Sequence, residues 1–255
     1  MIPYIQIPAI NLIGPLKLQP FGVLVVTGVL LGAWLFQKRA KEVNISEVCI
    51  YNTLWWLLFP GFIAAHIVEV LFYKPEAFTR DGLLALIKFW DGISSVGGLL
   101  GAMLGLCYYF LIQLKRTWWV EADLFVQSLI LGWIFGRLGC AITHDHPGRH
   151  TDFFLAVRYP DGPRHDLGFY EFLFTLFILF PLSIWLYKKN PKPGVIAMVL
   201  SAIYAFVRFF LDFLRVDGVD MRYWNLTPAQ YGCIILMAFC VYFFYTLRFR
   251  HNNNS

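Results

Sequence analysis

The sequence has 255 residues, of which 58% are hydrophobic and 15% charged, with a formal net charge of +5. Soluble domains are about 45–50% apolar, so this composition, with a mean hydropathy of +0.60, excludes an ordinary soluble domain and predicts an integral membrane protein. The basic residues lie in short loops between apolar runs and form no basic face interleaved with aromatic residues, which argues against nucleic-acid binding.

Seven apolar stretches are long enough to cross a bilayer at about 20 residues each. In chain order they cover residues 21–36, 48–72, 83–114, 122–138, 168–187, 194–214 and 228–247. Because they fill nearly the whole chain, we predict one all-α membrane domain over residues 1–255, a polytopic bundle of transmembrane helices. The third stretch is interrupted by Asp91, Gly92 and the Gly97–Gly98 pair, and we expect its first part to dip into the membrane rather than cross it.

The loops between these stretches differ in charge. One alternating set is rich in basic residues, for example Lys38, Arg116 and Lys189, whereas the other set is balanced. Lys and Arg accumulate in cytoplasmic loops, so seven spans place the N-terminus outside and the C-terminus in the cytoplasm. Residues 149–167 form a polar stretch on the predicted outer side, which we expect to be an extended arm or hairpin, with a plain connecting loop as the alternative.

Arginines at membrane depth are the first candidates for function. Arg137 lies at the end of the fourth stretch, and a charged side chain at that depth costs about 3 kcal/mol unless it meets a partner or polar ligand. Arg208, Asp212 and Arg215 share a helix face by their spacing, so the carboxylate can pair with either arginine and leave the other free for a ligand. Two guanidinium groups facing one cavity suit a phosphate, to which they form paired hydrogen bonds.

Other polar or small residues within the apolar stretches can each be interpreted as functional or as structural. Glu69 with His66, and Glu171, are candidates for the site or for simple pairing between helices. Five glycines are candidate lipid contacts, because glycine lets backbone approach a bulky head group, or else packing positions between helices: Gly97, Gly98, Gly136, Gly139 and Gly148.

The run HDHPGRH at residues 144–150 combines Asp145 with three histidines, two of which, His144 and His146, flank it directly. It could ligate zinc, but zinc favours three or four ligands, and only His165 and Asp166 offer a second cluster nearby. We therefore expect no metal, and interpret the run as a base or head-group contact, with a polar loop as the alternative. The five cysteines lack metal-ligand spacing and are predicted to be small core residues: Cys49, Cys107, Cys140, Cys233 and Cys240.

Three segments together resemble the prolipoprotein diacylglyceryl transferase family, which attaches a diacylglyceryl group to the cysteine of a lipoprotein precursor. Gly136, Arg137, Gly139 and Gly148 stand at the spacing of the family signature. The segment FWDGISSVGGLLGA (89–102) is similar to the family's WDGGMSFHGGLIG, and FVRFFLDFLR (206–215) to its FRxxxExxR. The family also carries a Tyr-Glu pair such as the one formed by Tyr170 and Glu171.

The chain departs from the family pattern at named positions. Val96 stands where the family has a histidine, and Phe21 where it has a tyrosine. Within the signature, Cys140 and Thr143 replace two asparagines, and Asp145 replaces a glutamate. The resemblance is therefore to a divergent member of the family.

The resemblance implies a transferase of the bacterial inner membrane that serves lipoprotein biogenesis as a monomer without a cofactor. Phosphatidylglycerol would bind with its phosphate on Arg137 and Arg208, the lipobox thiol of a prolipoprotein would attack the glyceryl carbon, and glycerol phosphate would leave. The nucleophile is the thiolate, and a thiol has an ordinary pKa of about 8.5, so a base that takes its proton would assist the attack. With the family histidine absent, His144, His146 and His66 are the candidates for this base, and Asp145 could orient one imidazole.

Two other classes stay open. One keeps the fold and the phosphate site but is a divergent phospholipid head-group transferase or hydrolase, metal-assisted through His144 and His146; the changes at Val96 and Phe21 favour it. The other is a non-enzymatic lipid-binding or anion-translocating membrane protein, which a continuous polar path to the cytoplasmic side would support.

Overall fold

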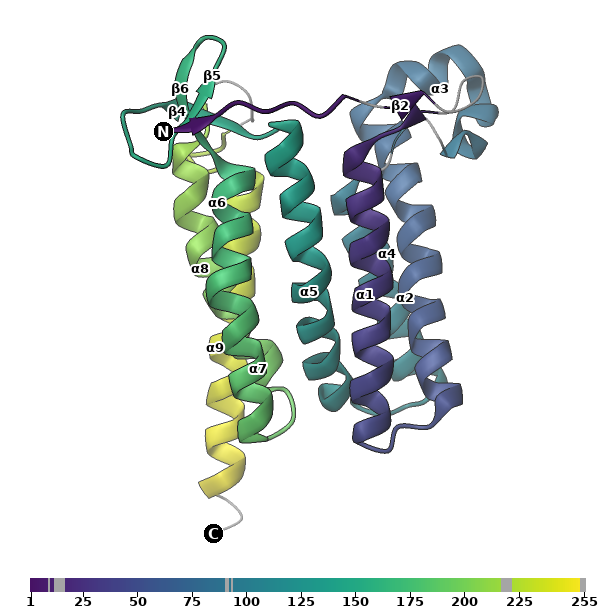
Figure 1. Ribbon diagram of the computed structural model, residues 1–255. Coiled ribbons are helices and arrows are strands. Elements are labelled where there is room, and N and C mark those ends of the chain that lie inside the picture. Colours follow the sequence, from purple (N-terminus) through teal and green to yellow (C-terminus); the bar gives the residue numbers. More distant parts are fainter. Residues whose placement is uncertain (9, 12–16, 90–91, 93, 217–221, 253–255) are drawn as a thin grey trace. The chain divides into compact units, whose positions relative to one another are not determined.

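The computed structural model describes residues 1–8, 10–11, 17–89, 92, 94–216 and 222–252 (Figure 1). The chain forms two compact units, each described here by itself. Residues 1–36 and 119–255 make up what we call the terminal unit, and residues 37–118 the inserted unit. Asp91, at the expected break in the third stretch, lies outside the described residues.

Helices that could cross a membrane dominate both units. Within the described residues, seven helices are long and apolar enough: Pro20–Glu42, Glu47–Phe72, Val96–Gln113, Trp119–Thr143, Leu167–Lys189, Val195–Leu214 and Pro228–Arg248. This confirms the prediction of a polytopic all-α membrane protein. The fourth span continues to Thr143 instead of stopping at residue 138, so Arg137 and Gly139 lie within the helix. His144, with a φ of 53°, follows its last residue.

The inserted unit contains α2 (Glu47–Val68), α3 (Pro75–Asp81) and α4 (Ser95–Cys107), with π-helical continuations at Glu69–Tyr73 and Tyr108–Gln113. Serine side chains cap the two longer helices: Ser46 accepts from Cys49 N and Ser94 from Gly97 N, each at 3.3 Å. The first part of the third apolar stretch forms a separate 3-10 helix, Gly82–Ile87, and the membrane-length helix begins only at Val96.

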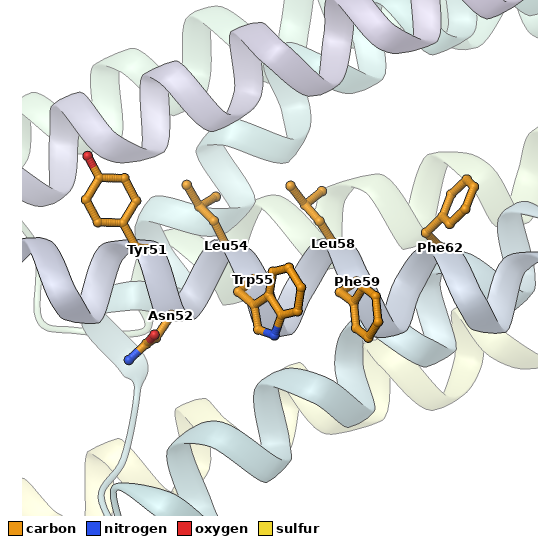
Figure 2. Close-up of a pocket in the computed structure, with 7 residues that line it drawn as sticks. All are labelled: Tyr51, Asn52, Leu54, Trp55, Leu58, Phe59 and Phe62. Atoms are coloured by element: carbon orange, nitrogen blue, oxygen red, sulfur yellow. The ribbon is translucent and has the colours of Figure 1, made fainter.

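Helices α2 and α4 approach closely through glycines. A Cβ atom at Gly97 would lie 2.5 Å from the backbone oxygen of Ala64, whereas one at Gly98 would make an ordinary contact of 3.6 Å with Ala65 Cβ. Helix α2 carries a shallow pocket, shown in Figure 2 and lined by Tyr51, Asn52, Leu54, Trp55, Leu58, Phe59 and Phe62. Its lining holds no residue that is charged at neutral pH, so it offers no charged partner for a phosphate.

The terminal unit contains α1 (Pro20–Glu42, up to residue 36), α5 (Trp119–Thr143), α6 (Leu167–Phe174), α7 (Phe180–Lys189), α8 (Val195–Leu211) and α9 (Pro228–Asn252). A π-helical turn, Thr175–Leu179, joins α6 to α7, and a 3-10 turn, Asp212–Leu214, follows α8. The buried carboxylate of Asp123 on α5 accepts two hydrogen bonds of 2.7 Å from the amides of Gly194 and Ala197 at the start of α8. This fixes the register between the two helices that carry Arg137 and Arg208.

A small four-stranded sheet lies at one end of α6 and α8 (Figure 1). Its order is β1 (Ile2–Pro3), β5 (Val157–Tyr159), β6 (Gly162–Asp166) and β4 (Pro147–His150). The predicted arm therefore contains a β5–β6 hairpin. A second, two-stranded sheet pairs β2 (Ile10–Asn11) with β3 (Lys17–Leu18).

The sheet is tied to the helices at two points. Asp166, the last residue of β6, caps α6 by accepting from Phe169 N at 2.9 Å. Gly148 of β4 pairs with Arg215 beyond α8, and a Cβ atom there would lie 2.7 Å from Leu214 O. The sheet thereby holds residues 144–150 over the ends of the two helices.

Candidate active site: an arginine and carboxylate cluster in the terminal unit

Glu171 joins three helices in the centre of the candidate site. Its carboxylate on α6 lies 3.0 Å from Nε of Arg137 on α5 and 3.5 Å from Nε of Arg208 on α8. It also accepts a hydrogen bond of 3.2 Å from the hydroxyl of Tyr204, one turn before Arg208. The side chain of Glu171 is only 1% exposed. A buried carboxylate thus brings together the two arginines that the sequence predicted to share one ligand.

Asp212 pairs with two arginines at once. Its Oδ1 lies 2.9 Å from Arg208 Nη1 and 3.1 Å from Arg215 Nε, while Oδ2 accepts a short hydrogen bond from the Thr227 hydroxyl. The helical spacing correctly predicted these contacts. The expectation that one of the two arginines stays free was wrong, because the carboxylate sits between both. We call these six residues the arginine cluster: Arg137, Glu171, Tyr204, Arg208, Asp212 and Arg215.

The two arginines of the candidate phosphate site are largely buried. The side chains of Arg137 and Arg208 are 13% and 10% exposed, and both lie against Glu171, with Asp212 beside Arg208 as well. Arg137 Nε and Arg208 Nη1 lie close to carboxylate oxygens without the angle of a hydrogen bond. Buried guanidinium groups need hydrogen-bond acceptors. A phosphate bound to the two guanidinium groups would accept hydrogen bonds from them.

Arg137 is held on its other sides by aromatic and sulfur atoms. Its guanidinium carbon lies 4.6 Å from the ring centroid of Trp133, and Nη1 lies 3.9 Å from Cys140 Sγ. A Cβ atom at Gly136, the preceding residue, would have nothing within 4 Å, so there is open space at this position of α5. Gly139, in contrast, packs on Phe21, whose ring carbon would lie 2.8 Å from an added Cβ. Of the signature glycines on α5, Gly136 is the one with room for a ligand.

His144, which follows the last residue of α5, forms a buried pair with Asp166. Its Nδ1 donates to Asp166 Oδ2 at 2.7 Å, and the Tyr159 hydroxyl donates to the same oxygen at 2.9 Å. The ring stacks on Tyr4 at a centroid distance of 4.2 Å, and its side chain is 6% exposed. Burial and the Asp166 carboxylate raise the pKa of Tyr159, so its hydroxyl stays protonated. Among the described residues, Nε2 of His144 is buried without a hydrogen-bond partner.

His146 belongs to a different cluster. Its Nδ1 lies 2.5 Å from Asp145 Oδ1, and its ring also contacts Cys140. Hydrogen bonds to the Asp145 carboxylate and the Cys140 sulfur raise the pKa of His146 to about 9. One potential donor atom each from Cys140, Asp145 and His146 lies within 4.8 Å of the others. Cys140 is buried as predicted, but it contacts charged groups and is not simply a core residue.

The two histidines of the run have different carboxylate partners. Asp145 orients one imidazole, as expected, and that imidazole is His146, while Asp166 orients His144. His165 Nδ1 instead contacts the Tyr170 hydroxyl at 2.9 Å. In the inserted unit, both ring nitrogens of His66 contact backbone oxygens, Gly92 O at 3.0 Å and Ala85 O at 2.9 Å, which identifies it as a structural tie.

Comparison with known proteins decides the family. The model of the prolipoprotein diacylglyceryl transferase family matches residues 8–246. The chain belongs to the prolipoprotein diacylglyceryl transferase family. Relatives named phosphatidylglycerol--prolipoprotein diacylglyceryl transferase include one from Pasteurella multocida, 34% identical over 84% of this chain and 81% of the relative. The relative from Pseudoalteromonas atlantica is 33% identical over 82% of this chain and 75% of the relative. The relative from Pseudomonas fluorescens Pf-5 is 29% identical over 92% of this chain and 91% of the relative.

In this member of the prolipoprotein diacylglyceryl transferase family, Arg137 of the signature meets Arg208 of the C-terminal segment through Glu171. Sequence reasoning missed Tyr204, although its spacing of four before Arg208 could have placed it on the same helix face. It also missed the roles of Tyr4 and Tyr159. Nothing local marks those tyrosines, because β1 and β5 reach His144 only through the folded sheet.

Proposed function

We propose that this protein transfers the diacylglyceryl group of phosphatidylglycerol to the lipobox cysteine of a prolipoprotein and releases glycerol phosphate. The observation that carries the proposal is the arginine cluster, in which Arg137 and Arg208, on two membrane-length helices, share the buried carboxylate of Glu171. Family membership supports the same reaction, since the relatives are named for it.

The two arginines bind the phosphate and stabilise its charge. As the glyceryl C–O bond breaks, negative charge gathers on the departing glycerol phosphate, and fixed guanidinium groups in a low-dielectric site lower the barrier. Glu171 holds both groups in place, and Tyr204 in turn holds Glu171. The space beside Gly136 is the candidate position for the head group. Four other glycines remain predicted lipid contacts, in addition to the contacts that each makes with protein: Gly97, Gly98, Gly139 and Gly148.

His144 is the proposed base for the acceptor thiol. Asp166 accepts a hydrogen bond from Nδ1–H, which leaves Nε2 as the nitrogen that can accept a proton, without a partner among the described residues. The lipobox sulfur forms a bond to the glyceryl carbon, its proton passes to His144 Nε2, and the C–O bond to phosphate breaks. His146 is less suited, because Asp145 and Cys140 already occupy its ring. Asp145 therefore acts on His146 and not on the proposed base.

We infer from the loop charges on which side of the membrane the reaction takes place. The N-terminus and the β5–β6 hairpin lie outside the cytoplasmic membrane of a bacterium, and the C-terminus lies in the cytoplasm. The arm at residues 149–167 then meets the prolipoprotein on the side where the candidate base is found. The protein acts as a monomer and needs neither metal nor organic cofactor for this chemistry.

The decisive experiment uses purified protein, a lipobox peptide and phosphatidylglycerol labelled either in the glyceryl backbone of its diacylglycerol part or in the head group. We expect the first label on the peptide through a thioether, and the second in released glycerol phosphate. Diacylglycerol appearing without peptide labelling would establish a hydrolase instead. Binding of the lipid with no product in either arm would support the non-enzymatic alternative.

A further inference from the structure

The Cys140 thiol lies beside the proposed phosphate clamp. Cys140 follows Arg137 by three residues on α5, so the two side chains share a helix face. Nη1 of Arg137 lies 3.9 Å from the sulfur, and Cys140 is 7% exposed. A phosphate ester held by this guanidinium carries its glyceryl carbon only one oxygen away from phosphorus. In such a complex the sulfur would lie near the carbon that the acceptor thiol attacks.

A carboxylate and an imidazole complete the surroundings of this sulfur. Asp145 Oδ1 lies 2.5 Å from His146 Nδ1, and His146 contacts Cys140. A thiol, an imidazole that accepts its proton and a carboxylate that orients the imidazole form the usual arrangement of an activated cysteine. Reactive thiols also lie next to Arg or protonated His. Arg137 satisfies the first of these conditions.

The same three side chains could also be ligands for a cation. A zinc ion prefers such nitrogen, sulfur and oxygen donors. The guanidinium of Arg137 next to the sulfur opposes this, because it places a permanent positive charge beside the metal position. The charge pattern therefore favours a reacting thiol over a metal ligand.

We propose that Cys140 is a site of self-modification, at which the thiol takes the diacylglyceryl group of a phospholipid bound to Arg137. The inference rests on the proposed function. Cys140 reacts as a thiolate paired with protonated His146, which holds the thiol proton; a bond forms between Cys140 Sγ and the glyceryl carbon, and the C–O bond breaks as glycerol phosphate leaves. A thioether has no good leaving group, so the product is stable and fills the site. The modification competes with the lipobox thiol and accumulates when no acceptor peptide is present.

The test measures the mass of the intact protein after incubation with phosphatidylglycerol in the absence of peptide. We expect a shift of one diacylglyceryl group per chain, mapped to Cys140 and resistant to hydroxylamine. Cys140→Ser should lose the shift, and the matched variant Cys240→Ser, at a buried cysteine of α9, should keep it. His146→Gln should slow the modification by about a hundredfold, the size of a typical base contribution. Thermal unfolding in detergent checks that each variant folds.

Two results would overturn the inference. One is transfer to a lipobox peptide by a protein whose own mass never changes, which would leave the proposed function intact. The other is a hydroxylamine-labile shift of one acyl chain, which would identify a thioester formed at an ester carbonyl. If neither the peptide nor Cys140 gains the lipid group, this inference and the proposed function both fail.

Discussion

In the terminal unit, the role that we assign to each arginine or histidine depends on the carboxylate that it contacts. Arg137 and Arg208 face one shared carboxylate, His144 faces Asp166, and His146 faces Asp145. Because these contacts are short and mostly buried, substitutions at single positions should have separable effects on lipid binding, proton transfer and stability.

Lysine should replace neither Arg137 nor Arg208. An ammonium group cannot reproduce the planar two-point contact with phosphate. We expect each lysine variant to lower diacylglyceryl transfer by about a hundredfold, similar to the loss of one charge-stabilising donor. The double variant should lose less than the two single losses combined, since the arginines act as a unit. The measurements are peptide labelling and binding of phosphatidylglycerol.

The matched control for the arginine variants is Arg158→Lys, at an exposed position of β5. It should transfer normally. Near-normal transfer by Arg137→Lys or Arg208→Lys in folded protein would leave these arginines with only a structural role between helices.

The His144→Ala variant should show a rate defect that depends on pH. At neutral pH the acceptor thiol is mostly protonated and needs a base, whereas at alkaline pH more of it is already thiolate. We therefore expect a large loss of transfer rate near pH 7 that shrinks toward pH 9. His150→Ala, at an exposed histidine, is the control. An equal loss at every pH would argue against His144 as the base.

The Asp145–His146 pair should stabilise the fold in a defined pH range. The folded pKa of His146, about 9, lies above its ordinary value of 6.5. The raised pKa means that the folded protein holds the proton more tightly, so the stabilisation is fully present below pH 6.5 and is lost as pH rises through 9. The unfolding temperature should fall over this interval by more in the unsubstituted protein than in His146→Gln. Parallel curves for the two proteins would show that the pair contributes nothing measurable.

At the scale of elements, the packing of α2 on α4 tests which glycines are structural. Gly97→Ala would place a methyl group 2.5 Å from the backbone oxygen of Ala64, and overpacking of this kind typically costs about 1–3 kcal/mol. Gly98→Ala meets only an ordinary contact, so its stability should be unchanged or slightly higher. Thermal unfolding of the two variants measures the difference.

The same pair of variants separates packing from lipid binding. If Gly98 contacts phospholipid, as we predict from the sequence, Gly98→Ala should weaken phosphatidylglycerol binding without lowering the unfolding temperature. Equal destabilisation by both substitutions would contradict the close approach at Gly97. Unchanged binding by Gly98→Ala would remove this glycine from the set of lipid contacts.

At the scale of the whole molecule, the loop charges predict the orientation in the membrane. A cysteine introduced as Asp161→Cys, in the turn of the β5–β6 hairpin, should react with an impermeant thiol reagent added to intact cells. Lys189→Cys, at the end of α7, should react only after the cells are opened. Labelling of Lys189→Cys from outside would reverse the predicted topology, and with it the side on which the prolipoprotein arrives.

The sequence alone determined the features that depend on neighbouring residues in the chain. The apolar stretches predicted seven spans because hydropathy adds up locally, and the boundary error at Thr143 arose because polar residues can continue a helix that packs against protein. The pairing of Arg208 and Arg215 with Asp212 followed from helix geometry alone. The family was likewise evident from three short segments in the expected order.

Only the tertiary structure decided which distant groups meet. Arg137 reaches Arg208 through Glu171 because α5, α6 and α8 pack together, and no local pattern encodes that meeting. The sheet determines which carboxylate each histidine contacts. Strand β6 brings Asp166 to His144, although Asp145 is the residue that follows His144 in the sequence. Charge pairing in a buried site depends on distances across the fold, which adjacency along the chain does not determine.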